Sequence, residues 1–197
     1  SWFNINPWDY NLYFWGHYTD FFEKNKQIFF DYLQNRFRIF EFSENEIEKL
    51  IKVRKKIKYI HGYSSMINDL SIVAKSNNIV FPNLKMIKAT SETVHENYEK
   101  NVVNSFNLPI VNEYGAAETG IIAFSCPHGK MHINSDNIIL EQNSLGEAIV
   151  TNLNSKSFPF IRYNLGDVVE ISTSSCTCQL PFPVLEKVYG RTGVKIL

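Results

Sequence analysis

The sequence has few cysteines, no excess of either charge and no long apolar run. Its 20 basic residues balance 20 acidic residues, so nothing indicates nucleic acid or an anionic membrane surface as a main partner. No apolar stretch approaches the length of a membrane span, and no signal peptide opens the chain. A hydrophobic content of 44% is typical of a globular protein. We therefore expect a globular, cytoplasmic protein without a membrane span.

The two ends of the sequence predict an internal fragment. The chain begins with Ser1 rather than methionine and ends at Leu197, directly after an apolar run. Eight aromatic residues fall within the first eighteen positions. Core packing is the simpler interpretation of these aromatics. The alternative is that they pack on a missing N-terminal portion or on a second subunit, which would make a homodimer.

From about Asp20 to Gly115, helical and strand-like patterns alternate along the chain. Ser43 and Glu46 form a capping-box pattern ahead of apolar residues at helical spacing. Repeated strand–helix–strand units of this length predict a parallel, layered α/β sheet. The expected helices are Asp20–Asn35, one after Ser43, one from Ser64, and Thr93–Phe106; the expected strands are Arg36–Phe42, Lys58–His61, Leu84–Ala89 and Leu108–Glu113.

After Gly115 the pattern changes to short strand-like runs separated by Gly, Asn, Asp, Ser and Pro. This pattern predicts a small antiparallel β subdomain. We expect an α/β subdomain over residues 1–115, a β subdomain over 116–189 and the start of a hinge over 190–197. The expected strands of the second part include Ile121–Phe124, Ile138–Glu141, Glu147–Thr151 and Val168–Ile171.

Polar residues follow three of the strands expected in the first part. Singly, such residues are often helix caps and turn residues. The carboxyl ends of parallel strands meet at one edge of a sheet, where ligands bind, so the three loops together predict a pocket. The loop residues are Tyr63, Ser64 and Ser65, then Thr90, Ser91 and Glu92, then Tyr114, Gly115 and Glu118.

Three motifs resemble those of the adenylate-forming enzymes. YGAAETG at 114–120 resembles their Tyr-Gly-x-Thr/Ser-Glu motif, and RYNLGD at 162–167 resembles their Arg-Tyr-x-x-Gly-Asp motif. GRTGVKI at 190–196 resembles their Gly-Arg motif at the hinge between the large and small domains. SCPHGKMHI and CTCQLPFPVLEKVYGR are similar to the phenylacetate–CoA ligase branch, and within it to ligase-like proteins of capsular polysaccharide gene clusters. The resemblance runs from about residue 57 to the end.

The resemblance implies part of the large N-terminal domain of a ligase. In this family, Mg-ATP and a carboxylic acid form an acyl-adenylate and pyrophosphate. The acyl group then passes to CoA or to another nucleophile. The expected cofactors are therefore ATP or AMP and Mg²⁺, and the expected partners are a small carboxylic acid and an acyl acceptor.

The resemblance also implies roles for single residues. Tyr114 would stack on adenine, and Glu118, the expected catalytic residue, would bind Mg²⁺ through a hard oxygen ligand. Asp167 would accept hydrogen bonds from the ribose diol, and Arg191 would contact ribose or α-phosphate oxygens. Without the motifs, these would be a core tyrosine, a solvent-facing glutamate, a turn aspartate and a salt-bridged arginine. The other expected nucleotide-binding residues are Ser91, Glu92, Glu113 and Gly115.

The sequence departs from the family pattern at two positions. Ala117 stands where the family has a hydroxyl that touches the α-phosphate, and Gly193 stands where the hinge has Asp or a basic residue. The family's phosphate loop and its C-terminal domain with the catalytic lysine are not in this sequence, so we expect the chain alone to be inactive. The alternative function is a non-catalytic relative that binds a nucleotide or a partner.

All three cysteines lie in the expected β subdomain, and they suit a metal site. Cys126, Cys176 and Cys178 with His132 would make a tetrahedral, structural Zn²⁺ site of the Cys₃His type. His128 is the alternative fourth ligand. The Cys-x-Cys spacing is tighter than the usual spacing of zinc ligands. Three packed thiols without a metal are therefore the other interpretation.

Overall fold

The computed structural model describes residues 2–16 and 21–191 of the 197-residue chain. The chain divides into an N-terminal unit of residues 1–111 and a C-terminal unit of residues 112–197. Each unit has its own buried apolar clusters, so each is described by itself.

The N-terminal unit is a parallel α/β structure. Its strands are arranged in the order β2-β1-β3-β4, and every pairing for which the register is given is parallel. Its strands are β1 (Asn11–Phe14), β2 (Arg36–Arg38), β3 (Tyr59–Tyr63) and β4 (Met86–Thr90). Its helices are α1 (Phe21–Leu33), α2 (Glu44–Val53), α3 (Ser64–Ser76) and α4 (Glu96–Phe106).

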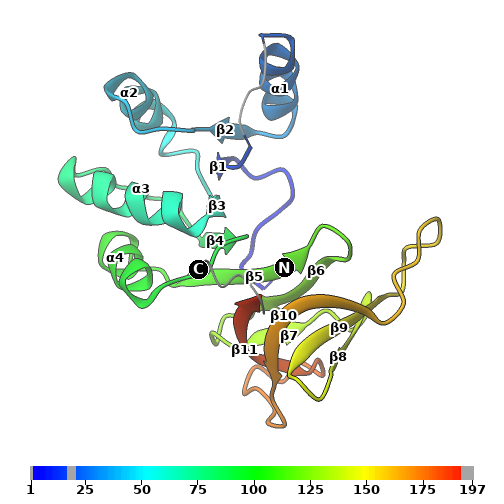
Figure 1. Cartoon of the computed structure of the whole chain (residues 1–197). Helices are drawn as coiled ribbons and strands as arrows, with labels where there is room; N and C mark the ends of the chain where they lie inside the picture. Colours follow the sequence, from blue (N-terminus) through cyan, green and yellow to red (C-terminus); the bar gives the residue numbers. More distant parts are fainter. Residues whose placement is uncertain (1, 17–20, 192–197) are drawn as a thin grey trace, which may run out of the picture. The chain divides into compact units, whose positions relative to one another are not determined.

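Alternate residues of these strands build the main core. Strand side chains point to opposite faces in turn, and one face of this sheet is apolar. The helices α2, α3 and α4 lie on the same side of the strands in Figure 1, and their apolar residues pack against that face. The core includes Leu12, Phe14, Ile60, Ile87 and Ala89 from the strands and Leu50, Ile67, Leu70 and Val102 from the helices.

The opposite face of the same strands is polar and aromatic. Asp31 of α1 accepts two hydrogen bonds of 2.8 Å from Arg38 of β2, one on each carboxylate oxygen. His61 of β3 lies on the same face, and its pKa is lowered to about 3 by burial and by the nearby charges of Lys88 and Arg36. The imidazole is therefore neutral at physiological pH and adds no charge to this face.

The C-terminal unit is an antiparallel β structure, and no helix occurs in the part of it that the structure describes. The strand order is β5-β6-β7-β11-β10-β9-β8, so the last strand is inserted between β7 and β10. The strands are β5 (Ile110–Ala116), which begins at the end of the first unit, β6 (Gly120–Ser125), β7 (Met131–Ile133), β8 (Ile138–Gln142), β9 (Glu147–Asn152), β10 (Tyr163–Ile171) and β11 (Val184–Arg191).

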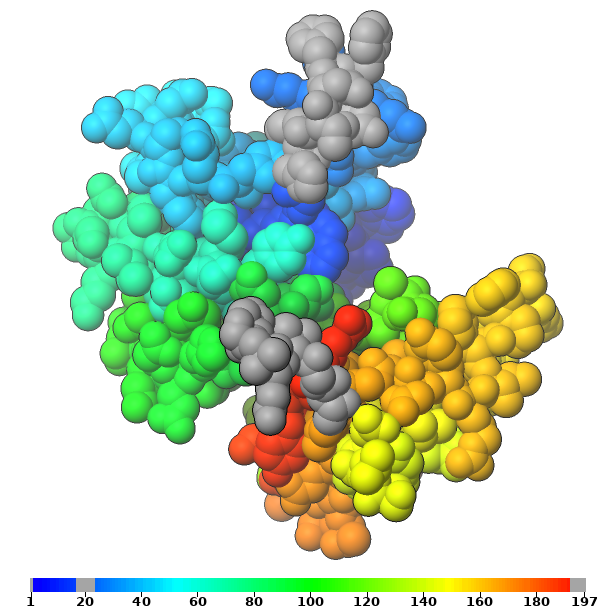
Figure 2. Space-filling view, in the orientation of Figure 1, coloured from blue at the N-terminus to red at the C-terminus, as the bar shows by residue number. Residues whose placement is uncertain are grey.

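Two small apolar clusters support this unit. One contains Ala123, Ile133, Ala148, Val169 and Leu185, and the other contains Ile122, Ile138 and Val150. Tyr114, Leu140 and Leu165 pack against both clusters. The segment between β9 and β10 carries exposed Phe158 and Ile161, and it projects from the unit, in gold, in Figure 2.

The structure confirms the predicted fold class, a parallel α/β part followed by an antiparallel β part. Some details differ. The strand β1 was not expected, and β2 ends at Arg38 rather than Phe42. The predicted capping box is wrong, because Ser43 precedes α2 but its side chain makes no capping hydrogen bond. Asp20, at the start of the predicted first helix, lies outside the described residues. None of the described helices is long and apolar enough to cross a membrane.

The buried ion pair between Asp31 and Arg38 gives a first prediction. Both side chains are nearly inaccessible, with 8% and 4% of their surface exposed. Asp31→Ala leaves a buried guanidinium without its carboxylate, so we expect a loss of about 3–5 kcal/mol in the free energy of unfolding. Denaturant titration measures this loss. The matched control is Glu96→Ala, which removes an exposed 3.6 Å pair with Lys100 and should leave the midpoint unchanged. Equal midpoints for both variants would contradict the assignment.

Candidate functional site

The motif YGAAETG forms the end of β5, a turn and the start of β6. The strand continues to Ala116, so Tyr114 and Gly115 lie in the strand rather than in the loop that was predicted after Glu113. A Cβ atom on Gly115 would come within 2.6 Å of the backbone oxygen of Gly120. Only glycine therefore allows the two strands to approach this closely before the turn.

The turn between β5 and β6 presents Glu118. Its half-buried carboxylate has no hydrogen bond or ion pair with any described residue. The next residue, Thr119, is 4% exposed, and its hydroxyl also has no hydrogen-bond partner in the described part of the chain. The side chain of Asn152 donates a 3.0 Å hydrogen bond to the Thr119 carbonyl oxygen, which fixes the turn. Sequence reasoning missed Thr119, although it adjoins Glu118 in the motif.

Tyr114, Asp167 and Arg191 come together from β5, β10 and β11. The Tyr114 hydroxyl donates a 2.8 Å hydrogen bond to Oδ2 of Asp167. Nε of Arg191 lies 3.8 Å from Oδ1 of the same carboxylate. Burial, and then the Asp167 carboxylate, raise the pKa of the Tyr114 phenol, so the hydroxyl remains a proton donor across the physiological pH range.

The motif RYNLGD brings Asp167 to this position through an irregular strand. Arg162 and Gly166 both have positive φ angles, of 49° and 74°. The pairing of β10 with β9 shifts register between Asn164 and Val168, and Asn164 Oδ1 accepts a 2.7 Å hydrogen bond from the Gly166 amide. Such a bulge re-aims the side chain that follows it, and Asp167 pairs in register with Arg191 of β11.

The remaining residues predicted to bind nucleotide occupy other places. Glu113 lies in β5 opposite Phe124 of β6. Ser91, with a φ angle of 64°, and Glu92 belong to the N-terminal unit, after β4. The Glu92 carboxylate accepts hydrogen bonds from the Ser65 amide at 2.9 Å and the Ser64 hydroxyl at 3.2 Å, at the beginning of α3. A carboxylate is favourable there because helix N-termini carry partial positive charge. Gly193, the predicted departure from the family pattern at the hinge, lies outside the described residues.

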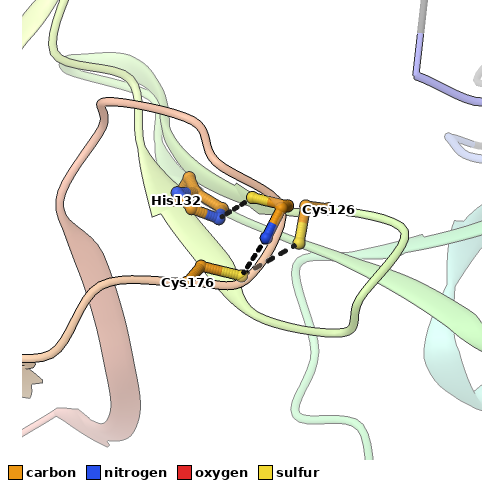
Figure 3. Close-up of side chains that lie close together, drawn as sticks. Cys126, His132 and Cys176 are labelled. Carbon is orange, nitrogen blue, oxygen red and sulfur yellow. Dashed lines mark hydrogen bonds between the residues drawn. The ribbon is translucent and has the colours of Figure 1, made fainter.

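Cys126, His132, Cys176 and Cys178 form a compact cluster in the C-terminal unit. One ligand atom from each residue lies within 4.8 Å of the other three. Cys126 Sγ is 3.8 Å from Cys176 Sγ, and His132 Nε2 is 3.2 Å from Cys178 Sγ. Figure 3 shows Cys126, His132 and Cys176 turned toward one another, with His132 on a strand and Cys176 on a long loop. The three thiols are free cysteines.

The surroundings of the cluster orient its histidine. Nδ1 of His132 lies 3.0 Å from the Phe182 carbonyl oxygen, so Nε2 faces the sulfur atoms. His128 instead contacts the Thr177 hydroxyl at 3.0 Å and remains exposed. The pKa of the Cys176 thiol is lowered to about 6, and the main cause is a hydrogen bond from the backbone amide of Cys178. This lowering favours the thiolate. The Phe182 contact could not be predicted, because a backbone carbonyl carries no sequence signal.

No protein-family model matches the chain. The chain is 26% identical over 137 residues to protein CapK of Staphylococcus aureus, and this match covers 64% of the chain and 28% of CapK. The match covers less than a third of that relative's length, so it reports a similarity to one part of CapK.

Solved structures with the same fold include an acyl-CoA ligase. An open conformation of 2-hydroxyisobutyryl-CoA ligase, in complex with 2-HIB-AMP and CoA, matches with a TM-score of 0.72 and 16% identity, over 96% of this chain and 46% of the ligase. ATP-bound MatB from Rhodopseudomonas palustris matches with a TM-score of 0.61 and 11% identity, over 96% of this chain and 41% of MatB. The chain thus spans less than half of these enzymes. The resemblance predicted from the motifs is confirmed at the level of the fold: this chain has the fold of part of an adenylate-forming acyl-CoA ligase.

Proposed function

We propose that this chain is part of an ATP-dependent ligase that converts a carboxylic acid to an acyl-adenylate and passes the acyl group to CoA or another nucleophile. The observation that supports this most directly is the contact of Tyr114 with Asp167, 53 positions apart, beside Arg191. All three come from motifs that resemble the family's nucleotide-binding motifs. The fold shared with ligases that bind an acyl-AMP or ATP agrees with this function.

The three residues fit a ribonucleotide. The half-buried ring of Tyr114 offers an aromatic surface to a purine. Asp167 can accept hydrogen bonds from a ribose diol, since a carboxylate has about four acceptor positions and Tyr114 uses only one. Arg191 is 74% exposed, so its guanidinium can turn toward a phosphate. Glu113 and Gly115 remain predicted contacts of this nucleotide. Ser91 and Glu92, which belong to the N-terminal unit, remain predicted nucleotide-binding residues.

Glu118 suits a magnesium ion that accompanies ATP. Its carboxylate has no partner among the described residues, so binding a cation would break no existing contact. Mg²⁺ binds proteins through one or two carboxylates together with phosphate oxygens and water. The ion would neutralise phosphate charge, and Glu118 would position it.

The cysteine–histidine cluster suits a structural zinc ion. With Zn–S distances of about 2.3 Å, the sulfur atoms of a tetrahedral site lie about 3.8 Å apart. Cys126 and Cys176 already have this separation. A zinc-binding histidine usually donates its other ring N–H to a carbonyl or carboxylate oxygen, and His132 Nδ1 lies 3.0 Å from such a carbonyl oxygen. Four protein ligands would close the site to substrate, so the zinc would stabilise the fold.

One observation favours a second function, a non-catalytic relative that binds a nucleotide or a partner. Ala117 occupies the exposed position before Glu118, and it has no hydroxyl for an α-phosphate. The complete open reading frame distinguishes the two functions. A phosphate loop upstream and a lysine-bearing domain downstream would favour the ligase.

Asp167→Ala tests the nucleotide site. In the complete protein that carries this sequence, we expect the variant to lose about 1.5–3 kcal/mol of AMP or ATP binding, because a charge-assisted clamp on the ribose is removed. Isothermal titration calorimetry measures the affinity. Asp136→Ala, an exposed aspartate of the same unit, is the control and should bind nucleotide normally. Unchanged affinity in Asp167→Ala would show that Asp167 does not hold the ribose.

Elemental analysis tests the zinc site. We expect one zinc per chain, and we expect the zinc content to fall sharply in Cys176→Ser and His132→Ala, with earlier thermal unfolding. The reason is that the metal joins segments about fifty residues apart and has no preformed site in the unfolded chain. Zinc affinity should also fall at acidic pH, because the ligands must be deprotonated.

His128→Ala is the matched control for the zinc site. It removes an exposed histidine whose ring contacts Thr177 rather than the cluster, so the zinc content should not change. Protein purified under mild conditions without any metal, or with three thiols that react freely while folded, would leave the cysteines as ordinary packing residues.

A further inference from the structure

The bond between Tyr114 and Asp167 links strands that do not pair with each other. Three strands, β6, β7 and β11, separate β5 from β10 in the sheet order. The sheet must therefore curl for the Tyr114 hydroxyl to reach the Asp167 carboxylate at 2.8 Å. This hydrogen bond therefore restrains two side chains, Tyr114 and Asp167, whose relative position is not fixed by the pairing of their strands.

The ring of Tyr114 is held in place by packing. Tyr114 packs against both apolar clusters of the C-terminal unit, as Leu140 and Leu165 also do. A side chain that packs against two clusters has little freedom to change rotamer. The position of the hydroxyl is therefore set by the core and not by the carboxylate that it contacts.

Asp167 depends on that hydroxyl for its orientation. Its side chain is 16% exposed, so water can contribute only a small part of its hydrogen bonding. The other described partner, Arg191 Nε, is 3.8 Å away, beyond hydrogen-bond distance, and the arginine is 74% exposed. The Tyr114 hydroxyl is the short, fixed contact, and it engages Oδ2 while Oδ1 faces Arg191.

We propose that Tyr114 has a second role besides offering its ring to adenine: its hydroxyl is a positioning group that holds Asp167 ready for the ribose diol. This inference rests on the proposed nucleotide-binding function. The phenol stays protonated and donates to Oδ2, so the remaining lone pairs of an ionised Asp167 accept from the two ribose hydroxyls. Ring stacking and diol recognition are thereby joined in one side chain.

Tyr114→Phe separates the two roles, because it keeps the ring and removes only the hydroxyl. In the complete protein we expect AMP affinity to fall about tenfold, as for loss of a hydrogen bond to a charged group. Affinity for 2′,3′-dideoxy-AMP, which has no diol, should stay within about twofold of the parent protein. Calorimetry with both nucleotides gives the ratio of the two affinities, which a general loss of stability would not change.

Two further variants complete the experiment. Tyr189→Phe removes a similar hydroxyl–carboxylate bond of 2.7 Å to exposed Glu170, so both affinities should match those of the parent. Asp167→Asn should abolish the preference for AMP over the dideoxy nucleotide. Adding Tyr114→Phe to Asp167→Asn should not lower AMP affinity further, because the Tyr114 hydroxyl acts through Asp167. Asp167→Asn alone keeps the packed Tyr114 side chain, so it still tests the diol preference if Tyr114→Phe folds poorly.

The outcomes separate this inference from the proposed function. If the parent protein binds AMP and Tyr114→Phe binds it equally well, the positioning role is overturned and the nucleotide site stands. The same holds if Tyr114→Phe weakens the binding of AMP and of dideoxy-AMP equally. It also holds if the effect of Tyr114→Phe on AMP affinity adds fully to that of Asp167→Asn. If the parent protein binds neither nucleotide, the proposed function is overturned, and the positioning role falls with it.

Discussion

The curl of the antiparallel sheet is the constraint on which the candidate site depends. Tyr114 and Asp167 belong to strands that three others separate, yet their side chains share a 2.8 Å hydrogen bond. The bulge between Asn164 and Val168 contributes to this geometry, because extra residues in one strand increase local bending. Gly115 contributes as well, since a side chain there would collide with Gly120 at the end of the hairpin. The motif glycines thus shape the sheet as well as the site.

The cysteine–histidine cluster lies beside the start of the strand that carries Arg191. The cluster joins the β6–β7 hairpin to the loop that leads into β11, and Val184 at the start of β11 pairs with His132. The other end of β11 pairs in register with Asp167. Figure 1 shows β11 as the last strand, in red, beside β10. Contacts at one end of this strand therefore help to fix the backbone position of Arg191 at its other end, while its exposed side chain can still turn.

The sequence predicted the parts of the fold that local patterns determine. Helical patterns located α1, α2, α3 and α4, and the described residues after Gly115 form strands without helices, as the change of pattern predicted. The set of three cysteines with His132 was chosen by residue type and is found as a cluster. The insertion of β11 between β7 and β10 was not predicted, because no local pattern encodes the pairing of distant strands. The bond between Tyr114 and Asp167 and the contact of Phe182 with His132 were missed for the same reason.

The contacts of four acidic residues separate carboxylates that stabilise the fold from those that can meet a ligand. Asp31 is neutralised by two hydrogen bonds from Arg38, and Glu92 is engaged at the start of α3 by Ser65. Binding a ligand through either carboxylate would break these hydrogen bonds. Asp167 keeps lone pairs beyond its bond to Tyr114, and Glu118 has no partner among the described residues. A diol needs an oriented acceptor, and a cation needs a carboxylate without competing donors. These contacts are the reason that we propose Asp167 for the ribose and Glu118 for the metal.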